Sequence, residues 1–184
     1  MAVHFIFICV LVVIVLVFLV TALFGAPYVP SGEREVFEVF RRLHKLTDED
    51  VVVDFGCGDG KVLRVAMASG AKEAVGMELN PILAALARLK SRRDGWIKIR
   101  CGNMLRMKLP EDMTVAYVFG VGWVMRALKP RLEEFANAQG RTVFVVSKAF
   151  EFDGVKAVKK WGGFFLYTIK PSEGGQSPLK KKML

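Results

Sequence analysis

Acidic side chains follow two predicted strands at the points where nucleotide-binding sheets hold their ligands. Asp54 lies near the end of the buried run Val51–Phe55, and Glu78 lies near the end of the next apolar run, Ala74–Leu79. The carboxyl ends of parallel strands meet at one edge of a sheet, so these carboxylates are expected to lie close together. A carboxylate at the second strand can accept hydrogen bonds from both hydroxyls of a ribose. The pair therefore predicts a nucleoside-binding site.

A glycine-rich turn joins the first of these strands to a helix. Its glycines can adopt positive φ and let a ligand approach the backbone. The dinucleotide fingerprint G-x-G-x-x-G would need glycine where this chain has Lys61. Carboxylates flank the turn instead; they would repel a pyrophosphate but suit a ligand with an ammonium and a sulfonium, such as S-adenosylmethionine. The predicted binding residues here are Asp54, Gly56, Cys57, Gly58, Asp59 and Gly60.

A third element, Gly102-Asn103-Met104, follows the predicted strand Trp96–Cys101. Asn103 is placed to hydrogen-bond the amino group of an adenine, and Leu79 and Met104 complete the predicted cosubstrate site. Each element has a plainer interpretation: the glycine turn as packing, Glu78 as a solvated strand end and Asn103 as a turn residue. The three fall at successive strand ends, where open α/β sheets bind ligands, and this coincidence favours a binding site.

The elements that would position these residues alternate between strands and helices. Such alternation predicts an α/β fold with a Rossmann-like, mainly parallel sheet and helices on both faces. Gly162-Gly163 between two apolar runs indicates a C-terminal antiparallel hairpin. The expected strands are 51–55, 74–79, 96–101, 114–119, 142–148, 155–161 and 164–170, and the expected helices are 31–45, with Ser31 as N-cap, 61–68, 80–93 and 124–138.

The first 31 residues contain none of the 27 basic and 18 acidic side chains. A helix over Val3–Phe24 would be about 33 Å long, enough to cross a hydrocarbon core of about 30 Å. We therefore expect a transmembrane anchor (1–25), a catalytic domain (26–170) and a disordered basic tail (171–184). Basic residues follow the anchor and none precedes it, which predicts a single-pass protein with its domain on the cytoplasmic side. Juxtamembrane and tail basic residues could contact anionic lipid headgroups.

The motifs together resemble class I methyltransferases and, more narrowly, the archaeal-type protein-lysine methyltransferases and their membrane-anchored mitochondrial relatives. The resemblance is carried by Ala26–Ser31, Asp54–Lys61 and Gly76–Pro81. It implies that Tyr28 and Ser31 help close the cosubstrate site and that protein lysine side chains accept the methyl group. From the residues alone, Tyr28-Val29-Pro30 would be a stiff linker leaving the anchor.

The fourth-strand strip Tyr117–Trp123 departs from the family pattern, in which this region more often reads Leu-Leu-Pro. The strip would border the acceptor, and Tyr28, Tyr117 and Trp123 are the candidate catalytic residues, expected to line an apolar channel for the amine. Trp123 could equally be a core residue. The Asn/Asp-Pro-Pro-Tyr signature of base or glutamine methylation is missing from the sequence.

The function predicted from the sequence is S-adenosylmethionine-dependent methylation of protein lysine at a membrane. One alternative is methylation of a membrane-embedded quinone or lipid, and another is a non-catalytic S-adenosylmethionine-binding module. The basic residues are scattered and form no stripe with interleaved aromatics, so no nucleic acid partner is expected. The cysteines and histidines show no metal-ligand spacing, so no metal site is predicted.

Overall fold

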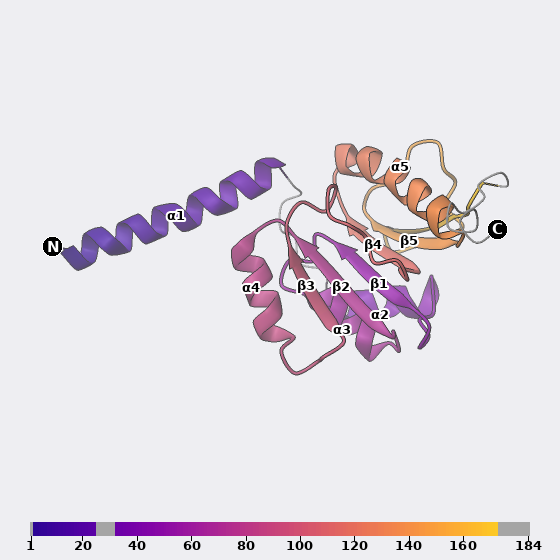
Figure 1. Cartoon of the computed structure of the whole chain (residues 1–184), viewed down its shortest axis with the longest axis horizontal. Coiled ribbons are helices and arrows are strands. Elements are labelled where there is room, and N and C mark those ends of the chain that lie inside the picture. The colour runs from indigo at the N-terminus through magenta and orange to yellow at the C-terminus, as the bar shows by residue number, and fades with distance from the viewer. Residues whose placement is uncertain (1, 25–31, 173–184) are drawn as a thin grey trace, which may run out of the picture.

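The computed structural model describes residues 2–24 and 32–172, with side chains in the first segment described as far as Phe18. The helices are α1 (Ala2–Phe24), α2 (Glu33–Arg42), α3 (Lys61–Ala68), α4 (Pro81–Lys90) and α5 (Gly122–Gln139). The strands are β1 (Val51–Phe55), β2 (Glu73–Glu78), β3 (Ile97–Cys101), β4 (Val115–Phe119), β5 (Val143–Lys148), β6 (Lys159–Trp161) and β7 (Phe164–Ile169). Figure 1 shows α1 projecting away from the α/β domain that the other elements form.

The strands of the described residues form one sheet in the order β3-β2-β1-β4-β5-β7-β6. The pairs from β3 to β5 are parallel, and β7 pairs antiparallel with both β5 and β6. The predicted Rossmann-like sheet with an antiparallel C-terminal hairpin is therefore confirmed. Strand order reverses between β1 and β4, and in open α/β sheets ligands bind at the carboxyl edge beside such a switch.

Buried side chains alternate between the two faces of the sheet, as the two-residue period of a strand requires. On one face Val53 and Phe55 of β1 pack with the apolar side of α5. On the other face Val52 packs with α2 and α3. The central strands are buried on both sides, which explains why β1 reads as a continuous apolar run interrupted only by Asp54.

The predicted element boundaries need local corrections. The N-cap of α2 is Gly32 and not Ser31, and the helix ends at Arg42. Helix α4 ends at Lys90, before the predicted Arg93. The strand predicted over 155–161 pairs only from Lys159, because a turn precedes it: Gly154 has a φ of 72° and the Val155 N–H donates to the Phe152 carbonyl.

Helix α1 has no charged residue, and its described side chains include a long series of exposed apolar residues between Val3 and Phe18. Within the described residues, no helix combines the length and apolar character needed to cross a membrane, so the predicted transmembrane assignment is not supported. The predicted tail falls mostly outside the described residues.

Candidate active site

Glu78, at the end of β2, is hydrogen-bonded to the segments that follow β1 and β3. Its side chain is buried, and Oε2 accepts a hydrogen bond from the Gly58 N–H at 2.8 Å while Oε1 accepts from the Asn80 N–H at 2.7 Å. Its backbone carbonyl accepts from the Gly102 N–H at 2.8 Å. Glu78 of β2 therefore joins the glycine turn after β1 to the segment after β3. The prediction that these three elements share one edge of the sheet is confirmed in its geometry.

Asp54 is a buried carboxylate beside this junction. It pairs in register with Gly76 on one side and Tyr117 on the other, and only 3 % of its surface is exposed. Burial raises the pKa of this carboxyl well above its usual range, and the nearby charges of Glu78 and Asp59 raise it further. Among the described residues, no hydrogen bond or ion pair to the Asp54 side chain is found. Asp54 therefore lacks the cationic partner that a buried carboxylate needs.

The turn after β1 has the open backbone that the sequence predicts. Gly56, Gly58 and Gly60 have φ values of 92°, 54° and 78°, a region that other residues rarely adopt. A Cβ placed on Gly56 would meet no described atom within 4 Å, so the space beside the turn is open there. Cys57 points the opposite way: burial raises the pKa of its thiol, and its Sγ fills the space above Gly76. Its side chain packs the turn onto β2.

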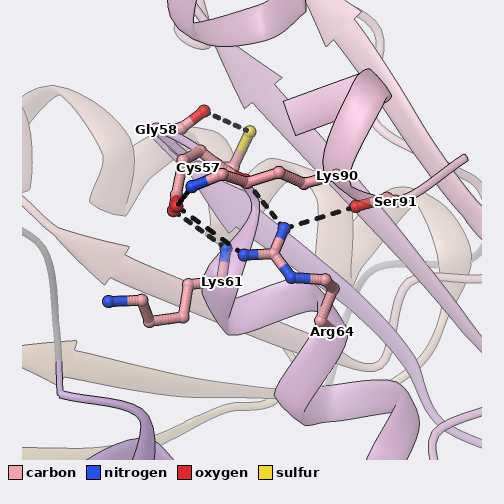
Figure 2. A network of polar contacts seen from close by, with 7 residues as sticks. Cys57, Gly58, Lys61, Arg64, Lys90 and Ser91 are labelled. Atoms are coloured by element: carbon pink, nitrogen blue, oxygen red, sulfur yellow. Dashed lines mark hydrogen bonds and ion pairs between the residues drawn. The ribbon is translucent and has the colours of Figure 1, made fainter. Parts of the chain in front are cut away.

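Asp59 makes contacts that sequence reasoning did not foresee. Its Oδ2 lies 2.7 Å from Lys90 Nζ and 3.7 Å from Arg64 Nη2, and Arg64 also donates to the Asp59 carbonyl at 2.8 Å. Figure 2 shows Lys90 and Arg64 converging on the loop from α4 and α3. The carboxylate that was predicted to face the cosubstrate is therefore already paired with two cations. The residue belongs to the loop, but its charge is directed at the helices.

The residues predicted to contact the adenine have less support from the structure. Asn103 is exposed, and its Oδ1 accepts a hydrogen bond from the Leu105 N–H at 2.8 Å, the turn role that was the plainer interpretation. Its Oδ1 keeps a second lone pair that can accept from the amino group of an adenine, and its NH2 group can donate to a ring nitrogen. Leu79 and Met104 are half-buried at the ends of the same segments, beside Glu78 and Asn103.

The structure separates the three predicted catalytic residues. Tyr28 lies outside the described residues, as does the predicted cosubstrate contact Ser31. Tyr117 is almost fully buried, and its ring packs between Phe40 and Phe164, so its ring belongs to the core rather than to an open channel. Trp123 lies in the first turn of α5 with 41 % of its surface exposed. The alternative interpretation of Trp123 as a core residue is therefore wrong.

The carboxyl ends of β4 and β5 carry a group of side chains of which sequence reasoning included only Phe119, as part of the strip Tyr117–Trp123. The rings of Phe119 and Phe150 lie 6.4 Å apart, and Phe150 is exposed. Lys148 Nζ lies 2.7 Å from Glu35 Oε2 of α2 and 5.9 Å from the Phe119 ring centroid. Lys148 and Glu35 are 113 positions apart in sequence, and the parallel pairing of β4 with β5 brings Lys148 beside Phe119.

The donors and acceptors of these residues suit S-adenosylmethionine. Each Glu78 oxygen accepts one backbone hydrogen bond and keeps a lone pair for a ribose hydroxyl. Asp54 would supply a carboxylate for an ammonium, and the glycine turn has no side chain on its open side at Gly56. The donors and acceptors match a nucleoside that also presents a positive charge.

Residues 54–159, more than half of the chain, match the model of the ANTKMT methyltransferase domain. The chain belongs to this methyltransferase family. A protein-lysine N-methyltransferase of Saccharolobus islandicus is 36% identical over 132 residues, which are 70% of this chain and 79% of that protein. The adenine nucleotide translocase lysine N-methyltransferase of Mus musculus is 41% identical over 120 residues, 64% of this chain and 51% of the mouse protein. The chain therefore spans only about half of the mouse relative's length.

A solved structure agrees with the assignment of the fold and cosubstrate. The RNA methyltransferase of Salinibacter ruber, in complex with S-adenosyl-L-homocysteine, superposes with a TM-score of 0.68 and 27% identity, covering 79% of this chain and 95% of that one. This chain is an S-adenosylmethionine-dependent methyltransferase. The matched segment begins at Asp54 and includes Glu78, so the predicted cosubstrate residues other than Tyr28 and Ser31 lie within the part that defines the family.

Proposed function

We propose that this methyltransferase transfers the methyl group to protein lysine side chains. The observation that carries the proposal is the similarity, at 36% and 41% identity, to enzymes named for lysine N-methylation. The segment that matches the family model, residues 54–159, includes the whole glycine turn and the end of β2.

The space left for an acceptor suits an alkyl amine. With the cosubstrate at the ends of β1, β2 and β3, the next strands in the sheet whose carboxyl ends lie at the same edge are β4 and β5. Phe119, Phe150 and the exposed Trp123 stand there. Aromatic faces attract an ammonium and pack along the methylene stem of a lysine. These rings are our proposed acceptor wall, in place of the buried Tyr117.

The reaction requires a neutral amine. The lysine nitrogen forms a bond to the methyl carbon while the carbon–sulfur bond breaks, and the electron pair of that bond returns to sulfur. The excess proton leaves the nitrogen for solvent. A free lysine has a pKa of about 10.4, and apolar surroundings lower it by disfavouring the charged form. The protein's contribution is then mainly to hold the amine and the methyl donor in line.

Transfer of a radiolabelled methyl group tests this proposal. The full chain in detergent would be incubated with labelled S-adenosylmethionine and, in separate reactions, with membrane proteins, extracted lipids or total RNA. We expect label in protein, recovered as methyllysine after hydrolysis, and none with the Asp54→Ala variant. Label in lipid would support the quinone or lipid alternative, and label in RNA would support an acceptor like that of the Salinibacter relative. Cosubstrate binding without transfer to any fraction would indicate a non-catalytic module.

We also propose where the enzyme works: α1 holds the chain at a membrane and the α/β domain faces the cytoplasm. The support is the absence of charge from residues 1–31 and the exposed apolar side chains of α1. In cells expressing the full chain, the protein should stay with membranes after alkaline carbonate extraction. Lysines introduced at Leu11 and Ile14 should release it, since burying a charged side chain in an apolar environment is strongly unfavourable. Release of the unchanged chain by carbonate would contradict the proposal.

A further inference from the structure

The glycine turn is held from both ends of one helix. Helix α4 starts beside Glu78, where Asn80 caps it by accepting from the Ile82 and Leu83 N–H groups. Glu78 binds the turn at Gly58. The helix ends at Lys90, whose ammonium binds the turn again at Asp59.

The turn and the helix are also packed closely between these two attachments. A Cβ placed on Gly60 would lie 3.3 Å from Ala87 Cβ of α4 and 3.2 Å from Arg64 Nη1. Arg64 itself bridges the two elements, because it donates to the Asp59 carbonyl and its Nη1 lies 3.5 Å from Ser91 Oγ, just after α4 (Figure 2). A small movement of α4 would therefore move the turn.

We propose that Asp59, Lys90 and Arg64 form an ionic clamp that fixes the glycine turn against α4, making Asp59 a positioning residue and leaving Asp54 to meet the cosubstrate's ammonium. The clamp deepens the methyltransferase assignment and is independent of the identity of the acceptor. It gives the two loop carboxylates different tasks, although the sequence presents them as equivalent flanks of one turn.

Charge and burial agree with this division. The Asp59 side chain is only 8 % exposed, whereas the Lys90 side chain is 44 % exposed. Burial raises the pKa of Asp59, but the hydrogen bond and charge of Lys90, followed by the charge of Arg64, outweigh it, so the pKa is lowered overall. Asp59 is thus ionised and compensated within the protein, while Asp54 is buried without a cation among the described residues.

Calorimetric titration of the full chain with S-adenosylmethionine separates a clamp from a direct contact. The variants are Asp59→Asn, Lys90→Met and the double variant, with Lys90→Arg as the conservative replacement. Lys98→Met is the matched control, because Lys98 forms a 2.7 Å ion pair with Glu73, is 54 % exposed and lies on β3 away from the turn.

A clamp predicts that Lys90→Met weakens binding by about five- to tenfold, the order of a partly buried ion pair, and that Asp59→Asn, which also loses the pair with Arg64, weakens it at least as much. The double variant should bind no more weakly than Asp59→Asn alone, because that change already removes the pair with Lys90. Lys90→Arg should bind within about twofold of wild type, and Lys98→Met should bind normally.

Two results would overturn the proposal. Unchanged affinity in Lys90→Met would show that the ion pair does not position the turn. A loss in Asp59→Asn far larger than in a variant that carries both Lys90→Met and Arg64→Met would identify Asp59 as a direct ligand of the cosubstrate. Binding alone is measured, so failure of the clamp is distinguishable from failure of the lysine proposal.

Discussion

Glu78→Gln is the substitution whose effect can be worked out most fully from the structure. The wild-type carboxylate accepts two backbone hydrogen bonds, from Gly58 at 2.8 Å and Asn80 at 2.7 Å. A glutamine amide offers one oxygen and one NH2 group in the same space. One of the two N–H groups would then face an NH2 donor and lose its partner.

Glu78→Gln should lower both the stability of the fold and the affinity for the cosubstrate. An unsatisfied buried N–H costs about 1–3 kcal/mol, and for a chain of this size each kcal/mol lowers Tm by about 2–4 °C. On the ligand side, a carboxylate can accept from both ribose hydroxyls, whereas the amide accepts from one. Losing one charge-assisted bond and weakening the other removes roughly 3 kcal/mol, which is a factor of about 100 in Kd.

The assay is calorimetric titration with S-adenosylmethionine, with thermal denaturation of the cosubstrate-free protein measured in parallel. Glu73→Gln is the control, since Glu73 lies at the opposite end of β2 and pairs only with Lys98 in the described contacts. We expect Glu73→Gln to bind normally. Glu78→Gln binding within about threefold of wild type, with an unchanged Tm, would refute the role given to Glu78.

Three further predictions concern packing, charge and the acceptor. Gly76→Ala would place a Cβ 2.5 Å from Cys57 Sγ, so it should destabilise the fold by about 1–3 kcal/mol and weaken cosubstrate binding; Cys57→Ala in the same chain should partly restore both, and a normal Tm for Gly76→Ala would be contrary. Because burial raises the pKa of Asp54, the folded state loses stability as pH rises through that pKa. The Asp54→Asn variant should therefore have a higher Tm than wild type between pH 5 and 8, with the largest gain at pH 8, and should bind S-adenosylmethionine about tenfold or more weakly. A Tm below that of wild type at every pH would contradict the role given to Asp54. Trp123→Ala should raise the KM for the protein acceptor severalfold with the cosubstrate Kd unchanged, and equal changes in both would place Trp123 outside the acceptor wall.

The cosubstrate half of the site was predictable because its signals are local. Glycines at 56, 58 and 60 mark the turn, and an acidic residue at the end of the next apolar run marks the ribose position. Alternation of strands and helices was enough to bring these segments to one edge. The role of Asp59 was not predictable, since Lys90 lies 31 positions away and reaches the turn because the C-terminal half of α4 packs beside it, with Ala87 next to Gly60.

The proposed acceptor wall depends on tertiary order, and the sequence alone favoured partly different residues for it. Tyr117 and Phe119 differ by two positions and point to the same face of β4, yet Tyr117 is covered by Phe40 and Phe164 while Phe119 reaches the strand end. Phe150 had no sequence signal, because its position beside Phe119 follows from the parallel pairing of β4 with β5. Exposure of Trp123 likewise follows from where α5 starts, which periodicity places only within a few residues.

A crystal structure of the full chain with S-adenosylhomocysteine would test the central claim most directly. We predict both ribose hydroxyls within hydrogen-bond distance of the Glu78 carboxylate and the ammonium of the ligand at Asp54, with Lys90 still paired to Asp59. A ligand whose ribose lies away from Glu78, or whose ammonium displaces Lys90 from Asp59, would contradict the site described above.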